Sequence, residues 1–360
     1  MTIQFTRRQG WRQRLSPVQL WTGFQDWLTS AKHATIGFSL LRIIFAVAML
    51  LVLLPSFADR HYLWGAGSWW VEPEARRRGW WEPFRLIFAK DDPLLFDLAY
   101  FALIALALLF LVGFKTRWVT PVLLLFWVGL SANTTLLTNG GDTLMRIVLV
   151  FALFADLSRH FSVDAWLRRR RGERAGRFDA LRRRVPEWLS PLLHNTALIL
   201  CCYQILLVYL VSSILKLQGE EWISGTALYY ALSLTEFQVL PALSEAVWQV
   251  TPFIMVGTWF ALVVQLTFPV ALLWKPSRYV AVAGLSLTHF GIGLLLGLWP
   301  FSLAMIALDL LLVRDASWLR VRAVVGMLVT RGRRAIAAAR ESVREGGDEL
   351  TPETPERRAA

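Results

Sequence analysis

Long apolar runs constrain this chain more than any other feature. Several of them reach the roughly 20 residues that an α-helix needs to cross about 30 Å of hydrocarbon. Hydrophobic residues make up 56% of the 360 positions and occur in runs, without the alternation typical of strands. Backbone groups in lipid must be hydrogen-bonded within the chain, which favours helices. We therefore predict an all-α, polytopic helical membrane protein.

The runs predict about eight transmembrane helices. Their expected bounds are 36–57, 94–113, 118–137, 143–157, 197–215, 252–274, 279–297 and 299–313. The stretches 58–93 and 222–250 mix aromatic, charged and apolar residues, which is typical of short helices in the outer interface. The expected organisation is a 1–35 cytoplasmic segment, a 36–313 membrane domain and a 314–360 basic cytoplasmic tail that is disordered at its end.

Basic residues concentrate in alternate loops. These loops contain 29 of the 38 lysines and arginines. They are the segments 1–35, 114–117, 158–196, 275–278 and 314–360. The positive-inside rule places these segments, and so both termini, on the cytoplasmic side of a plasma membrane of the bacterial type. The arginines at 168–184 are expected to contact anionic inner-leaflet lipid. Topology accounts for the net charge of +12, so nucleic acid is not an expected partner.

Three charged residues fall near the predicted cytoplasmic ends of spans: Arg42, Asp156 and Asp309. An ionisable side chain inside a span is costly and needs a partner or a purpose. The pattern favours a charge-paired clamp between the first, fourth and eighth spans.

A second polar layer lies at the outer ends of the spans. Asp142 and Arg146 stand four residues apart, so Asp142 either caps its helix and neutralises Arg146 or belongs to a site. Lys216 ends the span 197–215, and Tyr209 lies on the same helix face. Lys216 either anchors a helix end at the membrane surface or does proton chemistry, since an amine in a low dielectric loses its proton more easily.

His289 interrupts an apolar span in "LSLTHFGIGLLL". A lone histidine of this kind either packs with a hydrogen bond or binds a ligand. Gln265, in the middle of another span, is expected to need an interhelical partner. The adjacent Cys201 and Cys202 suit neither a disulfide nor a metal site, and no metal site is expected.

Three stretches resemble the membrane domain of the vitamin K-dependent gamma-glutamyl carboxylases. They are "YQILLVYLVSSILKLQGEEWISGTALYYAL", "GGDTLMRIVLVFALFADLSRHFSVDAW" and "LTHFGIGLLLGLWPFSLAMIALDLL". The similarity covers roughly 36–313, a region identified as a member of the HTTM (horizontally transferred transmembrane) domain family. Sporulation-delaying protein B and lipase maturation proteins are also similar.

The resemblance implies a reduced quinone, of the menaquinone or vitamin K type, as cofactor. Lys216 would deprotonate it on the outer face, His289 would line the pocket, and Asp142 occupies the position of a second catalytic histidine. Arg146, Tyr209 and Trp222 would bind the cofactor.

Three functions remain open. The first is a quinone-using enzyme, carboxylase-like at most. The second is a non-enzymatic maturation, export or immunity factor for a secreted peptide. The third, a transporter, ranks last because the sequence shows neither repeated halves nor broken helices.

Overall fold

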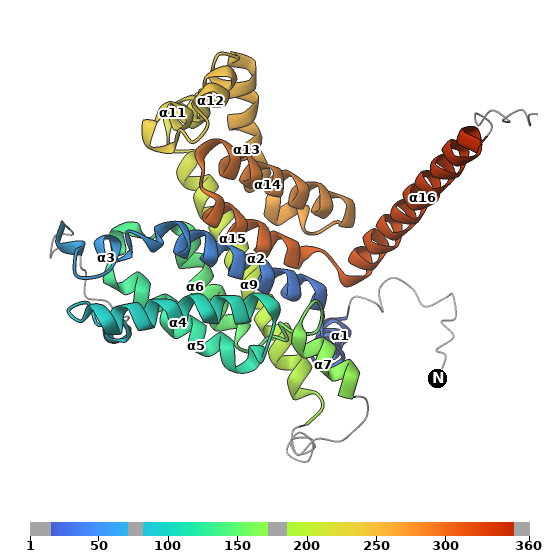
Figure 1. The fold of residues 1–360 in the computed structure, drawn as a ribbon, viewed down its shortest axis with the longest axis horizontal. Helices are drawn as coiled ribbons and strands as arrows, with labels where there is room; N and C mark the ends of the chain where they lie inside the picture. Colours follow the sequence, from blue (N-terminus) through green and yellow to red (C-terminus); the bar gives the residue numbers. More distant parts are fainter. Residues whose placement is uncertain (1–15, 71–81, 172–185, 349–360) are drawn as a thin grey trace, which may run out of the picture. The chain divides into compact units, whose positions relative to one another are not determined.

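The computed structural model describes residues 16–70, 82–171 and 186–348, and within these residues all regular structure is helical (Figure 1). The longer helices are α1 (Pro17–Ser30), α2 (Thr35–Leu53), α4 (Pro93–Val112), α5 (Thr116–Asn133), α6 (Gly140–Ala152), α7 (Val163–Arg171), α9 (Leu189–Lys216), α13 (Thr251–Ala271), α14 (Lys275–Leu296), α15 (Trp299–Asp309) and α16 (Asp315–Asp348). The prediction of an all-α protein is confirmed for the described part of the chain.

Five of the described helices are long and apolar enough to cross a membrane. They are Thr35–Phe57, Pro93–Val112, Leu189–Lys216, Thr251–Ala271 and Lys275–Leu296. The other three predicted spans correspond to α5, α6 and α15, and the latter two have 13 and 11 residues. A count of eight spans therefore remains a prediction.

α2 is the central helix of residues 1–313. Its most apolar stretch is 67% buried, against 28–33% in the other four apolar helices. Phe38, Leu41 and Phe45 are fully buried where α2 packs against α4 and α15. The surrounding helices leave apolar faces uncovered; Leu98 and Phe101 of α4, for example, are 57% and 50% exposed. A helix that is apolar all round and not buried by protein is suited to lipid, so the chain is a multi-pass membrane protein.

Short helices follow α2 and α9, in the two stretches expected to form outer interfacial helices. After α2 come η2 (Pro55–Phe57), α3 (Arg60–Leu63), η3 (Ser68–Trp70) and η5 (Glu82–Ile87), and η6 (Thr135–Leu137) precedes α6. After α9 come α10 (Glu220–Ile223), α11 (Ala227–Ser233), η7 (Thr235–Phe237) and α12 (Pro241–Trp248), and η8 (Leu310–Leu312) follows α15. α11 and α12 pack on each other and on α13 (Figure 1).

The segment that joins α11 to α12 packs against the turn between α14 and α15. Gly297 has φ +70°, a conformation that favours glycine. A Cβ at this position would lie 2.2 Å from Cγ2 of Val239. The absence of a side chain at Gly297 thus lets the connecting segment approach this turn.

Residues 314–360 form a separate compact unit that contains α16. The last twenty residues, 341–360, are predicted to be disordered; α16 instead continues to Asp348, and residues 349–360 lie outside the described residues. Most of the predicted lipid-contacting segment 168–184 also lies outside them, since the structure describes it only to Arg171.

Candidate functional site

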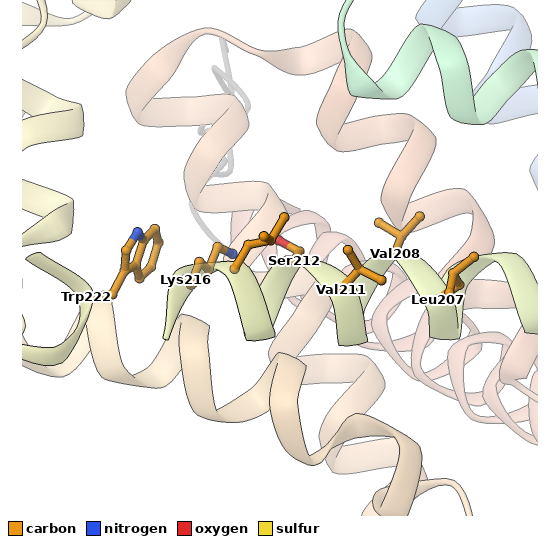
Figure 2. A pocket seen from close by; sticks show the side chains of 7 residues that line it. Leu207, Val208, Val211, Ser212, Lys216 and Trp222 are labelled. Carbon is orange, nitrogen blue, oxygen red and sulfur yellow. The ribbon is translucent and has the colours of Figure 1, made fainter. Parts of the chain in front are cut away.

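An apolar groove runs along one face of α9 and ends at Lys216 (Figure 2). Its volume is about 650 Å³, and its lining residues are Leu207, Val208, Val211, Ser212, Leu215, Lys216 and Trp222. The α9 members follow the helical repeat, which places them on one face. Small-molecule sites are typically mostly apolar cavities of this size with a few polar groups. The groove is therefore a candidate site for a largely apolar ligand.

The amine of Lys216 is held at the head of the groove by two contacts. Nζ donates a hydrogen bond to Oε1 of Gln265 on α13, at 2.6 Å. The same atom lies 4.7 Å from the ring centroid of Trp222, within the range of a cation–π contact. The prediction that Gln265 has an interhelical partner is confirmed, and that partner is the candidate base.

His289 of α14 is buried, with 2% of its surface exposed. The ring is 6.0 Å from that of Tyr209 and 5.5 Å from that of Phe301. Within the described part of the chain, neither ring nitrogen has a hydrogen-bond partner. Leaving buried polar atoms unpaired is costly, so His289 is a candidate ligand-binding group.

The ring of Tyr209 lies beside that of His289, while its hydroxyl points towards Asp309. The hydroxyl donates to both carboxylate oxygens of Asp309 on α15, at 2.9 and 3.0 Å. Both residues are buried. The hydroxyl of Tyr209 is therefore engaged by Asp309, and the ring is the part that lies near His289.

Asp142 takes part in a helix cap at the start of α6. The side chain of Asn139 accepts from the backbone N–H groups of Gly141 and Asp142, and the Asp142 carboxylate accepts from the Asn139 N–H at 2.9 Å. This reciprocal capping box satisfies amides that a helix start leaves unpaired. The capping interpretation of Asp142 thus has direct support, although the N-cap residue itself is Asn139.

Arg146 remains near Asp142 and contacts its main chain. Its Nε donates to the backbone oxygen of Asp142 at 3.3 Å, and its Nη2 donates to Thr143 at 3.0 Å. Phe301 lies between the start of α6 and His289. Its ring packs on His289, and its backbone lies so close to Gly141 that a Cβ there would be 2.8 Å from the Phe301 Cα. Phe301 was not predicted as a site residue, because a phenylalanine after "LWP" in an apolar run carries no chemical signal.

The predicted clamp between Arg42, Asp156 and Asp309 is wrong. Arg42 is fully buried and donates to four backbone carbonyls, those of Phe110, Leu111, Leu157 and Phe161. Two of these carbonyls belong to the last turn of α4, where helices leave oxygens unpaired and the dipole favours a cation. Arg42 therefore caps α4, Asp309 binds Tyr209, and Asp156 binds a different cation.

That cation is Lys32, whose Nζ lies 2.9 Å from Asp156. His194 adds a second connection: its Nδ1 accepts from the Asp156 N–H, and its Nε2 lies 2.7 Å from the oxygen of His33. Since a carbonyl oxygen can only accept, Nε2 carries the proton. Asn195 donates to the backbone oxygens of Trp27, Leu28 and Ala31. These contacts fix α1 against α9, and we call Lys32, Arg42, Asp156, His194 and Asn195 the inner cluster.

No group of histidine, cysteine or acidic side chains in the described ranges is arranged to hold a metal ion. The family model described as the HTTM domain matches residues 32–318. No curated protein and no solved structure matches the chain.

Proposed function

The chain belongs to the HTTM domain family, and we propose that it binds a reduced quinone, of the menaquinone or vitamin K type, in the groove along α9. The observation that carries this proposal is the amine of Lys216, fixed by Gln265 and Trp222 at the head of an apolar groove. The charge distribution of the loops favours a plasma membrane location with both termini in the cytoplasm and this end of α9 outside.

The residues present suit such a molecule. A reduced quinone combines a flat aromatic ring carrying hydroxyl groups with a long apolar tail. Leu207, Val211 and Leu215 offer the tail an apolar surface, and the Trp222 indole offers the ring a stacking partner. His289 is not among the groove-lining residues, and a ligand that reached it would find in its two unpaired nitrogens both a donor and an acceptor for a hydroxyl.

The chemistry we propose for the chain is proton abstraction. A reduced quinone supplies a weakly acidic hydroxyl and reducing equivalents when bound. Lys216 accepts the proton at Nζ in its neutral form, and Gln265 orients the amine through its own hydrogen bond. Carboxylation is not part of the proposal, because the Asp142 carboxylate is engaged in the α6 cap, where the carboxylases have a second catalytic histidine.

Titration of purified protein with oxidised and reduced menaquinone tests the proposal. We compare wild type, Lys216→Met and the control Lys275→Met, which removes an exposed lysine at the start of α14. The expected result is that wild type and Lys275→Met bind the reduced form alike. Lys216→Met should bind it at least about tenfold more weakly, a loss of about 1.4 kcal/mol. Equal binding by all three proteins, or no binding by wild type, would refute the proposal.

A second candidate is the non-enzymatic factor for a secreted peptide. The observation in its favour is the exposed apolar surface of the predicted outward region, where Tyr230, Val239 and Leu243 are 55%, 62% and 39% exposed. Such a factor would keep its function in Lys216→Met and lose it in Tyr230→Lys. The reverse pattern supports the quinone site.

A further inference from the structure

One face of α16 is apolar and uncovered. Val321, Val325, Leu328, Val329 and Ile336 are each 51–59% exposed. They stand at positions i, i+4, i+7, i+8 and i+15, which a helix aligns in one stripe. A stripe of this kind in water is unfavourable, so it calls for an apolar surface to cover it.

Arginines border this stripe on both sides. Arg320, Arg322, Arg331, Arg333 and Arg334 are all exposed. Between Asp315 and Glu341 the sequence contains no other acidic residue. The helix therefore presents a strongly basic surface around a continuous apolar line.

We propose that α16 lies flat on a membrane surface that carries anionic phospholipid, with the apolar stripe inserted between headgroups and acyl chains. Helices with an apolar face and a polar face rich in lysine or arginine bind membranes in this way. The flanking arginines reach phosphate groups at the level of the headgroups.

The position of α16 in the chain agrees with this partner. It starts six residues after Asp309, the last residue of the apolar helix α15. The tail is expected in the cytoplasm because of its charge, and the cytoplasmic leaflet is the one that carries a negative surface potential. This contact with lipid is separate from the proposed quinone site and does not rest on it.

A second copy of the chain is a less suitable partner for the stripe. Pairing two α16 helices through their apolar faces would bring the bordering arginines of both copies together. Stable helix pairs use opposite charges at such bordering positions, and residues 316–340 provide none. Anionic phosphate supplies the missing charge.

The test uses the full chain in lipid nanodiscs, with a polarity-sensitive fluorophore on a single cysteine. Val325→Cys places the probe in the stripe, and Ala323→Cys, about 160° around the helix, is the matched control. Cys201 and Cys202 are replaced by alanine in both proteins. Nanodiscs contain either phosphatidylcholine alone or a mixture with phosphatidylglycerol, and acrylamide quenching reports the exposure of the probe to water.

The expected result is a blue shift and several-fold weaker quenching at position 325, but not at 323, in the anionic nanodiscs. Replacing Arg331, Arg333 and Arg334 by glutamine, or raising the salt concentration, should restore quenching at position 325. Equal quenching at both positions in anionic lipid would overturn the proposal. So would protection at 325 that ignores lipid charge and coincides with energy transfer between labelled copies, since a second copy would then cover the stripe.

Discussion

The inner cluster and the region of the groove at Lys216 both contain buried polar groups in an apolar protein, but these groups differ in how completely they are hydrogen-bonded. In the inner cluster, Arg42 donates to four carbonyls and Asn195 to three. Near the groove, His289 is buried with both ring nitrogens unpaired within the described residues. A fully bonded buried network stabilises a fold, whereas a partly bonded one costs free energy that a bound molecule can recover.

The largest effect should follow from Arg42→Met. This change removes the side-chain donor of four backbone carbonyls, two of which belong to the end of α4. We expect a loss of roughly 3–5 kcal/mol in the free energy of unfolding, measured as a large drop in the thermal midpoint in detergent. Arg42→Lys keeps the charge, and its thermal midpoint should lie between those of wild type and Arg42→Met. An unchanged midpoint in Arg42→Met would mean that the inner cluster is not structural.

A smaller effect of the opposite sign is expected for His289→Leu. The two side chains have similar volumes, and leucine removes two unpaired buried nitrogens. Stability should rise by about 1 kcal/mol or stay unchanged, while affinity for reduced menaquinone falls. The thermal midpoint and a binding titration on the same sample separate the two outcomes. If His289→Leu is instead destabilised as strongly as Arg42→Met, His289 is a packing residue and the contrast between the regions fails.

The smallest effect is expected when acid weakens the ion pair between Lys32 and Asp156. Burial alone would raise the pKa of Asp156, but the positive charges of Lys32 and Arg168 outweigh burial and lower that pKa. Because the folded pKa lies below the unfolded value of about 3.9, the pair contributes its full stabilisation above that value and loses it as the pH falls through the folded pKa. We expect at most about 1 kcal/mol, since both side chains are partly exposed.

Thermal midpoints of wild type and Asp156→Asn between about pH 3 and 6 measure this contribution. The difference between the two proteins should shrink towards acid. A difference that stays constant across this range would assign the effect of Asp156 to packing.

The sequence predicted the helices well where apolar runs were long. α4 and the predicted span 94–113 differ by one residue at each end. α9 begins at Leu189, eight residues before the predicted start, because His194 and Asn195 interrupt the apolar run while their side chains bind the N-terminal segment. α6 ends at Ala152, so Asp156 lies beyond the helix and is free to meet Lys32.

Pairings between distant residues could not be predicted in the same way. The sequence places Arg42, Asp156 and Asp309 at a common depth, but depth does not say which partners each side chain meets. Backbone carbonyls and hydroxyls, which satisfied Arg42 and Asp309, leave no pattern of opposite charges to detect. Gln265 was expected to need an interhelical partner, and Lys216 to anchor a helix end or to do proton chemistry. That the two residues contact each other depends on the packing of α9 on α13.

The glycine at the α14–α15 turn has a mechanical consequence. Val239, from the segment between α11 and α12, occupies the space where a side chain of Gly297 would be. A load applied to α11 and α12, by a binding peptide or by lateral pressure from lipid, is thereby passed to the end of α14. His289 lies two turns before that end. A displacement of α11 and α12 therefore acts on the end of α14, the helix that carries His289.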